Sequence, residues 1–209
     1  MSNLIISVGR QFGSGGKEIG KKLAEELSIK CFDKEIIKLA AKDSGIREEM
    51  FEEADEKPVN SFLYSIVTHG FPSYTPSLQV NNILTNDKIF AFQANTIKKI
   101  ASEIPAVIIG RCADDILRDN EKLVKVFIYS DKEKRAERIS KIYNISEKES
   151  YEMIRRMDKS RSSYYEFFTG KNWGDVSNYD LCIDSSVGIE NVVKIIKNFI
   201  DIKYGNTEK

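Results

Sequence analysis

A glycine-rich segment near the N-terminus has the residue types of a phosphate-binding loop. It reads Gly9-Arg-Gln-Phe-Gly-Ser-Gly-Gly-Lys-Glu18 and lies between a short apolar run and an amphipathic stretch. Glycines let the backbone turn its N–H groups inward, and the N-terminus of a following helix adds a positive field, so such a loop suits phosphate. Lys17 could reach a terminal phosphate oxygen as a point charge. The residues assigned to nucleotide and phosphate binding are Gly9, Arg10, Gly13, Ser14, Gly15, Gly16, Lys17 and Glu18.

The segment departs from the common phosphate-loop pattern GxxxxGK[ST]. With Gly16-Lys17 as the GK pair, Gln11 stands at the first glycine and Glu18 at the Ser/Thr. In the other register, which aligns the pattern on Gly13-Ser-Gly15, Gly16 stands where the lysine belongs. Both registers lack the hydroxyl that usually holds Mg²⁺, so the metal ligands stay unknown. The alternative is a strand-to-helix turn without a ligand, but four glycines in eight positions favour phosphate binding.

Arginines stand where a phosphoryl-transfer enzyme would need them. Arg10 and Arg111 each follow an expected strand, and parallel α/β sheets bind ligands beyond the carboxyl ends of their strands. Guanidinium groups donate bidentately to phosphate, and one that neutralises a transferring phosphoryl group can be worth roughly 10³–10⁵ in rate. The alternative for residues 147–161 is a solvated helix with i,i+4 ion pairs. Because the chain also has a glycine loop suited to phosphate, we prefer a catalytic role for the arginines of this segment. The candidate catalytic residues are Lys17, Arg111, Arg155, Arg156, Asp158 and Arg161.

Three acidic positions have separate interpretations. Asp33 ends the second expected strand and could hold metal-bound water or a substrate hydroxyl. Asp184 is expected to cap the turn into the last helix, and Asp114 to lie in the first turn of a helix. The aromatic residues Tyr164, Tyr165 and Trp173 either stack a base or pack as a cluster.

The elements that must position these residues follow from hydrophobic periodicity. The pattern predicts five short apolar strands alternating with amphipathic helices, which is typical of a parallel sheet covered on both faces. Ser130–Glu133 and Ser146–Glu149 both have the capping-box pattern of a helix start. The Pro-rich segment 57–80 is expected to be a long loop. The predicted strands are Leu4–Val8, Ile29–Asp33, Ala106–Ile109, Val124–Tyr129 and Tyr179–Asp184, and the main helices span 17–27, 34–42, 87–102, 130–143 and 189–200.

Composition indicates one globular domain and excludes several other classes. The 209 residues include 41% hydrophobic and 31% charged residues, with 32 Lys and Arg against 32 Asp and Glu. A disordered chain would have lower hydrophobicity, and a nucleic-acid or membrane coat would need a basic excess. The three cysteines lack the CxxC spacing of a zinc site. No stretch approaches the ~20 apolar residues of a membrane span, and no basic leader precedes Leu4–Val8. We therefore expect a cytoplasmic protein with small-molecule partners, and neither a nucleic-acid polymer nor a membrane.

Motifs along the chain resemble those of the cytidylate kinase-like family, relatives of the nucleoside monophosphate (NMP) kinases. The resemblance implies a P-loop kinase fold, a three-layer α/β domain over residues 1–209 with a five-stranded parallel sheet. It also implies an NMP-binding insertion at about 45–95 and a helical lid at about 146–172. The matching segments are Ile6–Gly20, Phe32–Ile37, Val107–Asp114, Asp158–Arg161 and Trp173–Ser185.

The resemblance also implies roles for individual residues. Gly13–Lys17 would hold the donor phosphates and Arg111 the acceptor phosphate, while Arg155, Arg156 and Arg161 close over the transferring group and Asp158 orients one of them. The expected activity is ATP- and Mg²⁺-dependent phosphorylation of a nucleoside monophosphate, with CMP or dCMP as the first candidate. Two alternatives remain open: a P-loop kinase of a small metabolite of the shikimate or gluconate type, and a nucleotide-binding regulatory protein without catalysis.

Overall fold

The sheet of the computed structural model contains five parallel strands in the order β2-β3-β1-β4-β5. The structure describes residues 3–56 and 78–205, so most of the expected loop 57–80 lies outside the described residues. Central β1 pairs with β3 and β4 and is buried along its length except at Gly9, as expected for a strand covered on both faces. The strands are β1 (Ile5–Arg10), β2 (Lys30–Phe32), β3 (Ala106–Ile109), β4 (Leu123–Tyr129) and β5 (Leu181–Asp184).

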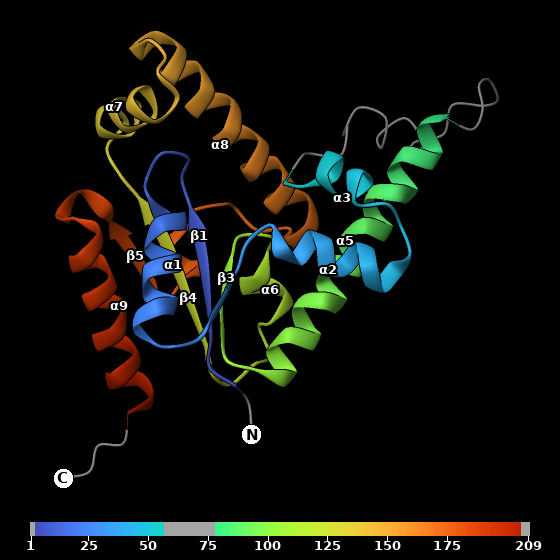
Figure 1. Ribbon diagram of the computed structural model, residues 1–209, viewed down its shortest axis with the longest axis horizontal. Coiled ribbons are helices and arrows are strands. Elements are labelled where there is room, and N and C mark those ends of the chain that lie inside the picture. The colour runs from blue at the N-terminus through green and yellow to red at the C-terminus, as the bar shows by residue number, and fades with distance from the viewer. Residues whose placement is uncertain (1–2, 57–77, 206–209) are drawn as a thin grey trace.

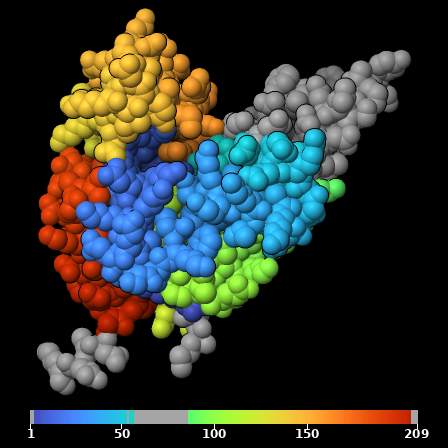
Figure 2. All heavy atoms as spheres, in the orientation of Figure 1, coloured from blue at the N-terminus to red at the C-terminus, as the bar shows by residue number. Residues whose placement is uncertain are grey.

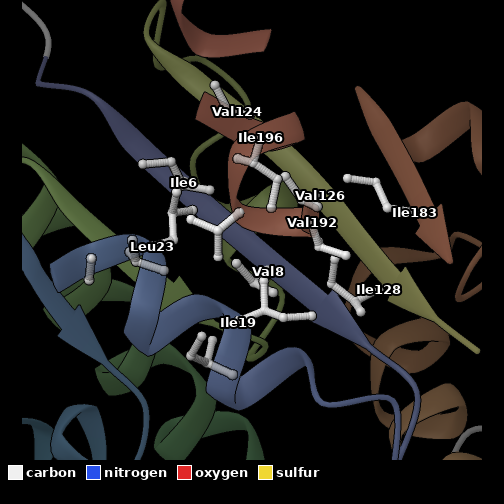
Figure 3. Close-up of a cluster of buried hydrophobic side chains, with 14 of the residues drawn as sticks. Ile6, Val8, Ile19, Leu23, Val124, Val126, Ile128, Ile183, Val192 and Ile196 are labelled. Carbon is white, nitrogen blue, oxygen red and sulfur yellow. The ribbon is translucent and has the colours of Figure 1, made fainter. Parts of the chain in front are cut away.

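Helices cover both faces of this sheet (Figure 1). On one face, α1 (Gly16–Glu26) and α9 (Ile189–Tyr204) bury side chains such as Ile19, Leu23 and Val192 against β1 and β4 (Figure 3). On the other face, α2 (Glu35–Ser44), α5 (Leu78–Glu103) and the short α6 (Ala113–Ile116) cover β3. These layers confirm the predicted three-layer α/β fold.

Three further helices stand around the carboxyl end of the sheet. Helix α3 (Glu48–Ala54) packs on α2 and α5 through Phe51. Helices α7 (Lys132–Tyr143) and α8 (Glu147–Thr169) project beyond the sheet as one protrusion, coloured yellow to orange in Figure 2. The expected insertion at about 45–95 contains α3 and the first part of α5, and the expected lid at about 146–172 contains α8, while their roles stay predictions.

The predicted helix starts had different outcomes. Ser146 and Glu149 form the expected reciprocal capping box at the start of α8. The box expected at Ser130–Glu133 is absent, because Asp131 is the N-cap of α7 and its side chain makes no capping hydrogen bond. The Ser130 N–H instead donates to Gln11 Oε1 at 3.2 Å, which ties β4 to the glycine loop. Helix α5 begins at Leu78, earlier than the expected start at residue 87.

Other expectations agree with the structure. Asp184 caps the short 3₁₀ turn Ser185–Val187 by accepting from the Ser186 N–H at 2.9 Å. Tyr164 and Tyr165 are buried with Cys112 in an aromatic cluster, which favours packing over base stacking for these two rings. Among the described residues, no helix has the length and apolarity to cross a membrane.

Candidate functional site

A cavity of about 770 Å³ lies at the carboxyl ends of β1, β2 and β3. Its walls come from the glycine loop, the start of α1, the residues after β2, the end of α3, Arg111, and the facing sides of α7 and α8. Its position agrees with the general rule that parallel α/β sheets bind ligands beyond their strand ends.

The glycine loop enters α1 through two residues in the left-handed region. Gly13 has φ 83° and Gly15 has φ 78°, values that L side chains rarely adopt. A Cβ on Gly13 would also lie 3.1 Å from the Arg135 side chain. Gly15 is the N-cap of α1 and supplies no side-chain cap, so the first N–H groups of the helix receive no side-chain acceptor from that position. This geometry suits an anion at the start of α1.

The structure brings only part of the predicted phosphate-binding set to the cavity. Ser14 is buried, and its Oγ donates to the Gln11 carbonyl at 2.8 Å, so it stiffens the loop. Gly9 lies beneath the Phe127 and Tyr179 rings, away from the large cavity. The carboxylate of Glu18 pairs with Arg138 of α7. The set members that line the cavity are Arg10, Gly13, Gly15, Gly16, Lys17 and Glu18.

Lys17 and Asp33 face each other across the cavity floor. Lys17 Nζ lies 2.7 Å from Asp33 Oδ2, and the second carboxylate oxygen accepts from Arg111 Nη1 at 3.2 Å. Burial would by itself raise the pKa of Asp33, but the Lys17 hydrogen bond and the charge of Arg111 outweigh it and lower the pKa. Asp33 is therefore a carboxylate at neutral pH.

Arg111 is directed toward the cavity by an unusual turn after β3. Gly110, Arg111 and Cys112 have φ values of 68°, 54° and 55°, three successive residues in the left-handed region. Such a conformation costs of order 1–3 kcal/mol per non-glycine residue and persists only where the surroundings enforce it. The Arg111 side chain is 1% exposed, and its Nη2 donates to Asp55 Oδ2 at 2.9 Å. The turn thus fixes a buried guanidinium at the strand end.

A second arginine cluster surrounds Glu56, the residue two positions after α3. Arg10 binds the Glu56 carboxylate through both terminal nitrogens, at 2.5 and 3.1 Å, and Arg161 Nε lies 3.1 Å from Oε2. Burial opposes ionisation, yet the charges of Arg10 and Arg161 lower the pKa of Glu56 far below its usual value. Ser160 Oγ also donates to the Glu56 carbonyl at 2.8 Å, so α8 is tied to the end of α3.

Asp158 connects α8 to the glycine loop rather than to the arginines of its own helix. Its Oδ1 accepts from the Phe12 N–H at 2.7 Å, and its Oδ2 accepts from Arg135 Nη1 at 2.6 Å. We expected Asp158 to orient Arg155, Arg156 or Arg161. The structure gives it Arg135 of α7 as its ion-pair partner, and this side chain is buried.

Arg155 and Arg156 lie away from the cavity. Both side chains are exposed on α8, whereas Met157, Ser160 and Arg161 are the residues of that helix that line the cavity. Their proposed closure over a transferring group stays a prediction.

Four functional candidates were missed by sequence reasoning. Arg135 and Arg138 follow β4 at helical spacing, so the strand-end rule could have found them. Asp55 and Glu56 belong to an acidic stretch without a motif, and their partners lie 46 to 105 positions away along the chain.

The cavity also has an apolar end, where the Phe12 and Tyr143 rings stack with centroids 6.4 Å apart.

Comparisons with known proteins bear on the fold and the family of the chain. A crystal structure of an uncharacterized protein from Eubacterium ventriosum is 31% identical, with a TM-score of 0.72 over 95% of this chain and 99% of that one. A shikimate kinase from Bacteroides thetaiotaomicron (13% identity, TM-score 0.54, 95% and 98% coverage) and a gluconokinase from Sinorhizobium meliloti (15%, 0.51, 99% and 98%) share the fold. No curated protein matches the chain.

The family comparison covers most of the sequence. The model of the Cytidylate kinase-like family matches residues 5–187, which include the glycine loop, Asp33, Arg111 and α8. The five-stranded parallel sheet and the kinase neighbours show the P-loop kinase fold. The chain therefore belongs to the cytidylate kinase-like family.

Proposed function

We propose that this protein transfers the γ-phosphate of ATP to the phosphate of a nucleoside monophosphate, with CMP or dCMP as the first candidate acceptor. The observation that carries the proposal is the convergence of Lys17, Arg10, Arg111 and Arg161 on one cavity beside the N-terminus of α1. Phosphoryl transfer needs mainly such positioning and neutralisation of charge on the phosphate oxygens.

Each group has a distinct task in the proposed reaction. The start of α1 and Lys17 bind the donor phosphates. Lys17 can reach them because it lines the cavity and its side chain is 55% exposed. Arg111, Arg10 and Arg161 bind the acceptor phosphate and hold one of its oxygens in line with the γ-phosphorus. That oxygen forms the new P–O bond while the bond to the leaving ADP oxygen breaks. Arg138 and the Phe12–Tyr143 wall complete the enclosure around the nucleotides.

The residues at the site are compatible with Mg²⁺ delivered together with ATP. Mg²⁺ prefers oxygen ligands and commonly takes one or two protein carboxylates besides the substrate phosphates. Within the described ranges, no group of three or more His, Cys, Asp or Glu side chains forms a metal cage. Asp33 presents a carboxylate that is 11% exposed beside Lys17 and is the residue that would hold Mg²⁺ or its water. When bound, the ion would neutralise charge on the donor phosphates.

A coupled ADP-release assay tests the proposal directly. The acceptor panel contains the common ribo- and deoxyribonucleoside monophosphates, with shikimate and gluconate as acceptors that represent the small-metabolite alternative. We expect acceleration with at least one pyrimidine monophosphate. Acceleration with only a non-nucleotide acceptor would replace the proposed substrate class. Thermal stabilisation by ATP without turnover on any acceptor would contradict the proposal and indicate a nucleotide-binding protein instead.

A further inference from the structure

We propose that Asp55 and Glu56 occupy the acceptor-phosphate subsite of the unliganded protein, and that a phosphomonoester binds by displacing their carboxylates from Arg10, Arg111 and Arg161. The inference rests on the proposed function and deepens it, because it names the ligand class of this subsite. Its test measures binding without turnover, so it can fail or succeed independently of the kinase assay.

The contacts show that two consecutive residues engage all three arginines. The Glu56 carboxylate accepts hydrogen bonds from both terminal nitrogens of Arg10 and from Nε of Arg161. The Asp55 carboxylate accepts one from Nη2 of Arg111. The three guanidinium side chains are only 1–13% exposed. Buried cations of like sign repel one another, so the cluster requires anions at this point. The end of α3 supplies them in the absence of a ligand.

The charge and shape of these two side chains match those of a phosphomonoester. Together Asp55 and Glu56 carry two negative charges when ionised, and a phosphate monoester carries about −1.5 to −2 at neutral pH. The guanidinium fork binds carboxylate and phosphate oxygens with the same bidentate geometry. The donors that now hold Asp55 and Glu56 can therefore hold a phosphate without being rebuilt. A neutral hydroxyl acceptor offers no such exchange.

The carboxylate of Asp55 fits the cluster incompletely, which favours its replacement. Asp55 Oδ1 and Arg111 Nε are buried without a hydrogen-bond partner in the described part of the chain. Burial raises the pKa of Asp55 even beside Arg111, so its charge is poorly compensated. Glu56 has φ 49°, a conformation unfavourable for a residue other than glycine. Displacement of the side chains would relieve the costs at Asp55 and Arg111, while the Glu56 backbone keeps its conformation.

Asp33 differs from Glu56 in how it is held. Asp33 directly follows β2 and retains both Lys17 and Arg111 as partners. The backbone of Glu56 is fixed to the opposite wall by the bond from Ser160 Oγ to its carbonyl. Among the described residues, the Glu56 carboxylate pairs only with Arg10 and Arg161, two of the arginines that the phosphate would bind, whereas Asp33 keeps Lys17 as a separate partner. Asp33 is therefore expected to stay when a ligand binds, and the Glu56 side chain is expected to leave.

Calorimetric titration of inorganic phosphate, CMP and cytidine into three proteins provides the test. These are the wild type, Glu56→Gln, and Glu52→Gln, which removes one exposed charge from the cavity rim with no arginine partner among the described residues. If Glu56 occupies the subsite nine-tenths of the time, its removal should tighten phosphate and CMP binding about tenfold. The Glu52→Gln variant measures how much phosphate affinity rises when any negative charge is removed near the cavity. The proposal is supported if this rise is much smaller than the rise in Glu56→Gln.

Cytidine separates the phosphate subsite from the rest of the cavity, because it lacks the anionic group. Its affinity should be the same in wild type and Glu56→Gln. Unchanged or weaker phosphate binding by Glu56→Gln would overturn the proposal, since it would make Glu56 a support for the arginines. An equal gain in phosphate affinity in Glu52→Gln would overturn the proposal as well, because removal of any nearby negative charge would then explain the gain.

A crystal structure of the wild type with phosphate decides the question if Glu56→Gln does not fold. We expect phosphate oxygens between Arg10 and Arg161, with the Glu56 carboxylate moved away from both. Phosphate bound elsewhere, with the Arg10–Glu56 pair intact, would overturn the proposal.

Discussion

The ammonium group of Lys17 lies 2.7 Å from the carboxylate of Asp33 and joins the first turn of α1 to the end of β2. The two side chains differ in environment, since Lys17 is 55% exposed and Asp33 only 11%. Arg111 also holds Asp33, at 3.2 Å. Lys17 can therefore turn toward a bound phosphate while Asp33 keeps a cationic partner.

Replacing Lys17 should remove turnover and spare folding. We expect Lys17→Ala to lower kcat by roughly 10²–10³-fold, the range for loss of one group that neutralises transition-state charge. The free energy of unfolding should change by at most about 1 kcal/mol, because the lysine is largely exposed. Lys22→Ala is the matched control, since Lys22 lies on the same helix and pairs with Glu190 outside the cavity. Near-normal turnover in Lys17→Ala would contradict the assigned role.

Two glycines with the same backbone conformation allow the cost of backbone strain to be measured separately from the cost of steric overlap. Gly110 and Gly170 have φ 68° and 69°, but a Cβ on Gly110 would overlap the Arg10–Glu56 pair, whereas nothing lies within 4 Å of one on Gly170. Gly170→Ala should cost about 1 kcal/mol in the free energy of unfolding. Gly110→Ala should cost a further ~1–3 kcal/mol, because the buried ion pair must move. Urea unfolding measures the stability of both variants. Equal losses in the free energy of unfolding would show that the Arg10–Glu56 pair moves aside without cost.

Asp114 should make the protein less stable as pH rises. Burial raises the pKa of Asp114, although a hydrogen bond from Tyr165 Oη at 2.7 Å partly opposes the shift. The folded state therefore binds this proton more tightly than the unfolded state, whose Asp pKa is about 3.9, and stability falls as pH rises from about 4 through the folded-state pKa.

Asp114→Asn keeps an acceptor for Tyr165 and removes the titration. The variant should gain stability relative to the wild type at pH 7 and lose that advantage near pH 4, as measured by urea unfolding at several pH values. Parallel pH profiles for the two proteins would show that Asp114 has no raised pKa.

The arginines of α8 should divide into two groups by their effect on turnover. Arg161 is nearly buried and binds Glu56, whereas Arg155 and Arg156 are exposed. We expect Arg161→Ala to lower kcat/KM roughly 10³-fold or more, because an arginine that holds the acceptor phosphate in line also neutralises charge on the transferring phosphoryl group. Arg155→Ala and Arg156→Ala should have much smaller effects in the ADP-release assay. Comparable losses in all three would indicate that α8 turns these side chains inward during the reaction.

The local sequence was sufficient to predict the architecture. Most strands are short, mainly apolar runs, and the long helices repeat apolar residues at helical spacing, because burial on a sheet imposes those periods. The boundaries of β3 were predicted without error, and α2 ends at Ser44, two residues beyond the predicted end at 42. The capping box at Ser130 failed because Gln11, far away in the chain, takes the backbone N–H of Ser130.

The site followed from the sequence only where local rules apply. Lys17, Asp33, Arg10 and Arg111 lie at strand ends or at a helix start, and parallel strands bring such positions to one edge of the sheet. For Arg161 the sequence indicated the residue type and the helix, but not which of three arginines faces the cavity. The rotation of α8 depends on its packing against α7 through Ile154, and this packing turns Arg161 inward.

By itself, the sequence determined the parallel α/β sheet, the glycine loop at the start of α1 and the arginines at the strand ends. Only the tertiary structure decided that Asp55 and Glu56 neutralise those arginines and that Asp158 binds Arg135. The physical reason is the range of the interactions. Periodicity and turn chemistry act over a few residues, whereas an ion pair needs two groups within about 4 Å, at any separation along the chain.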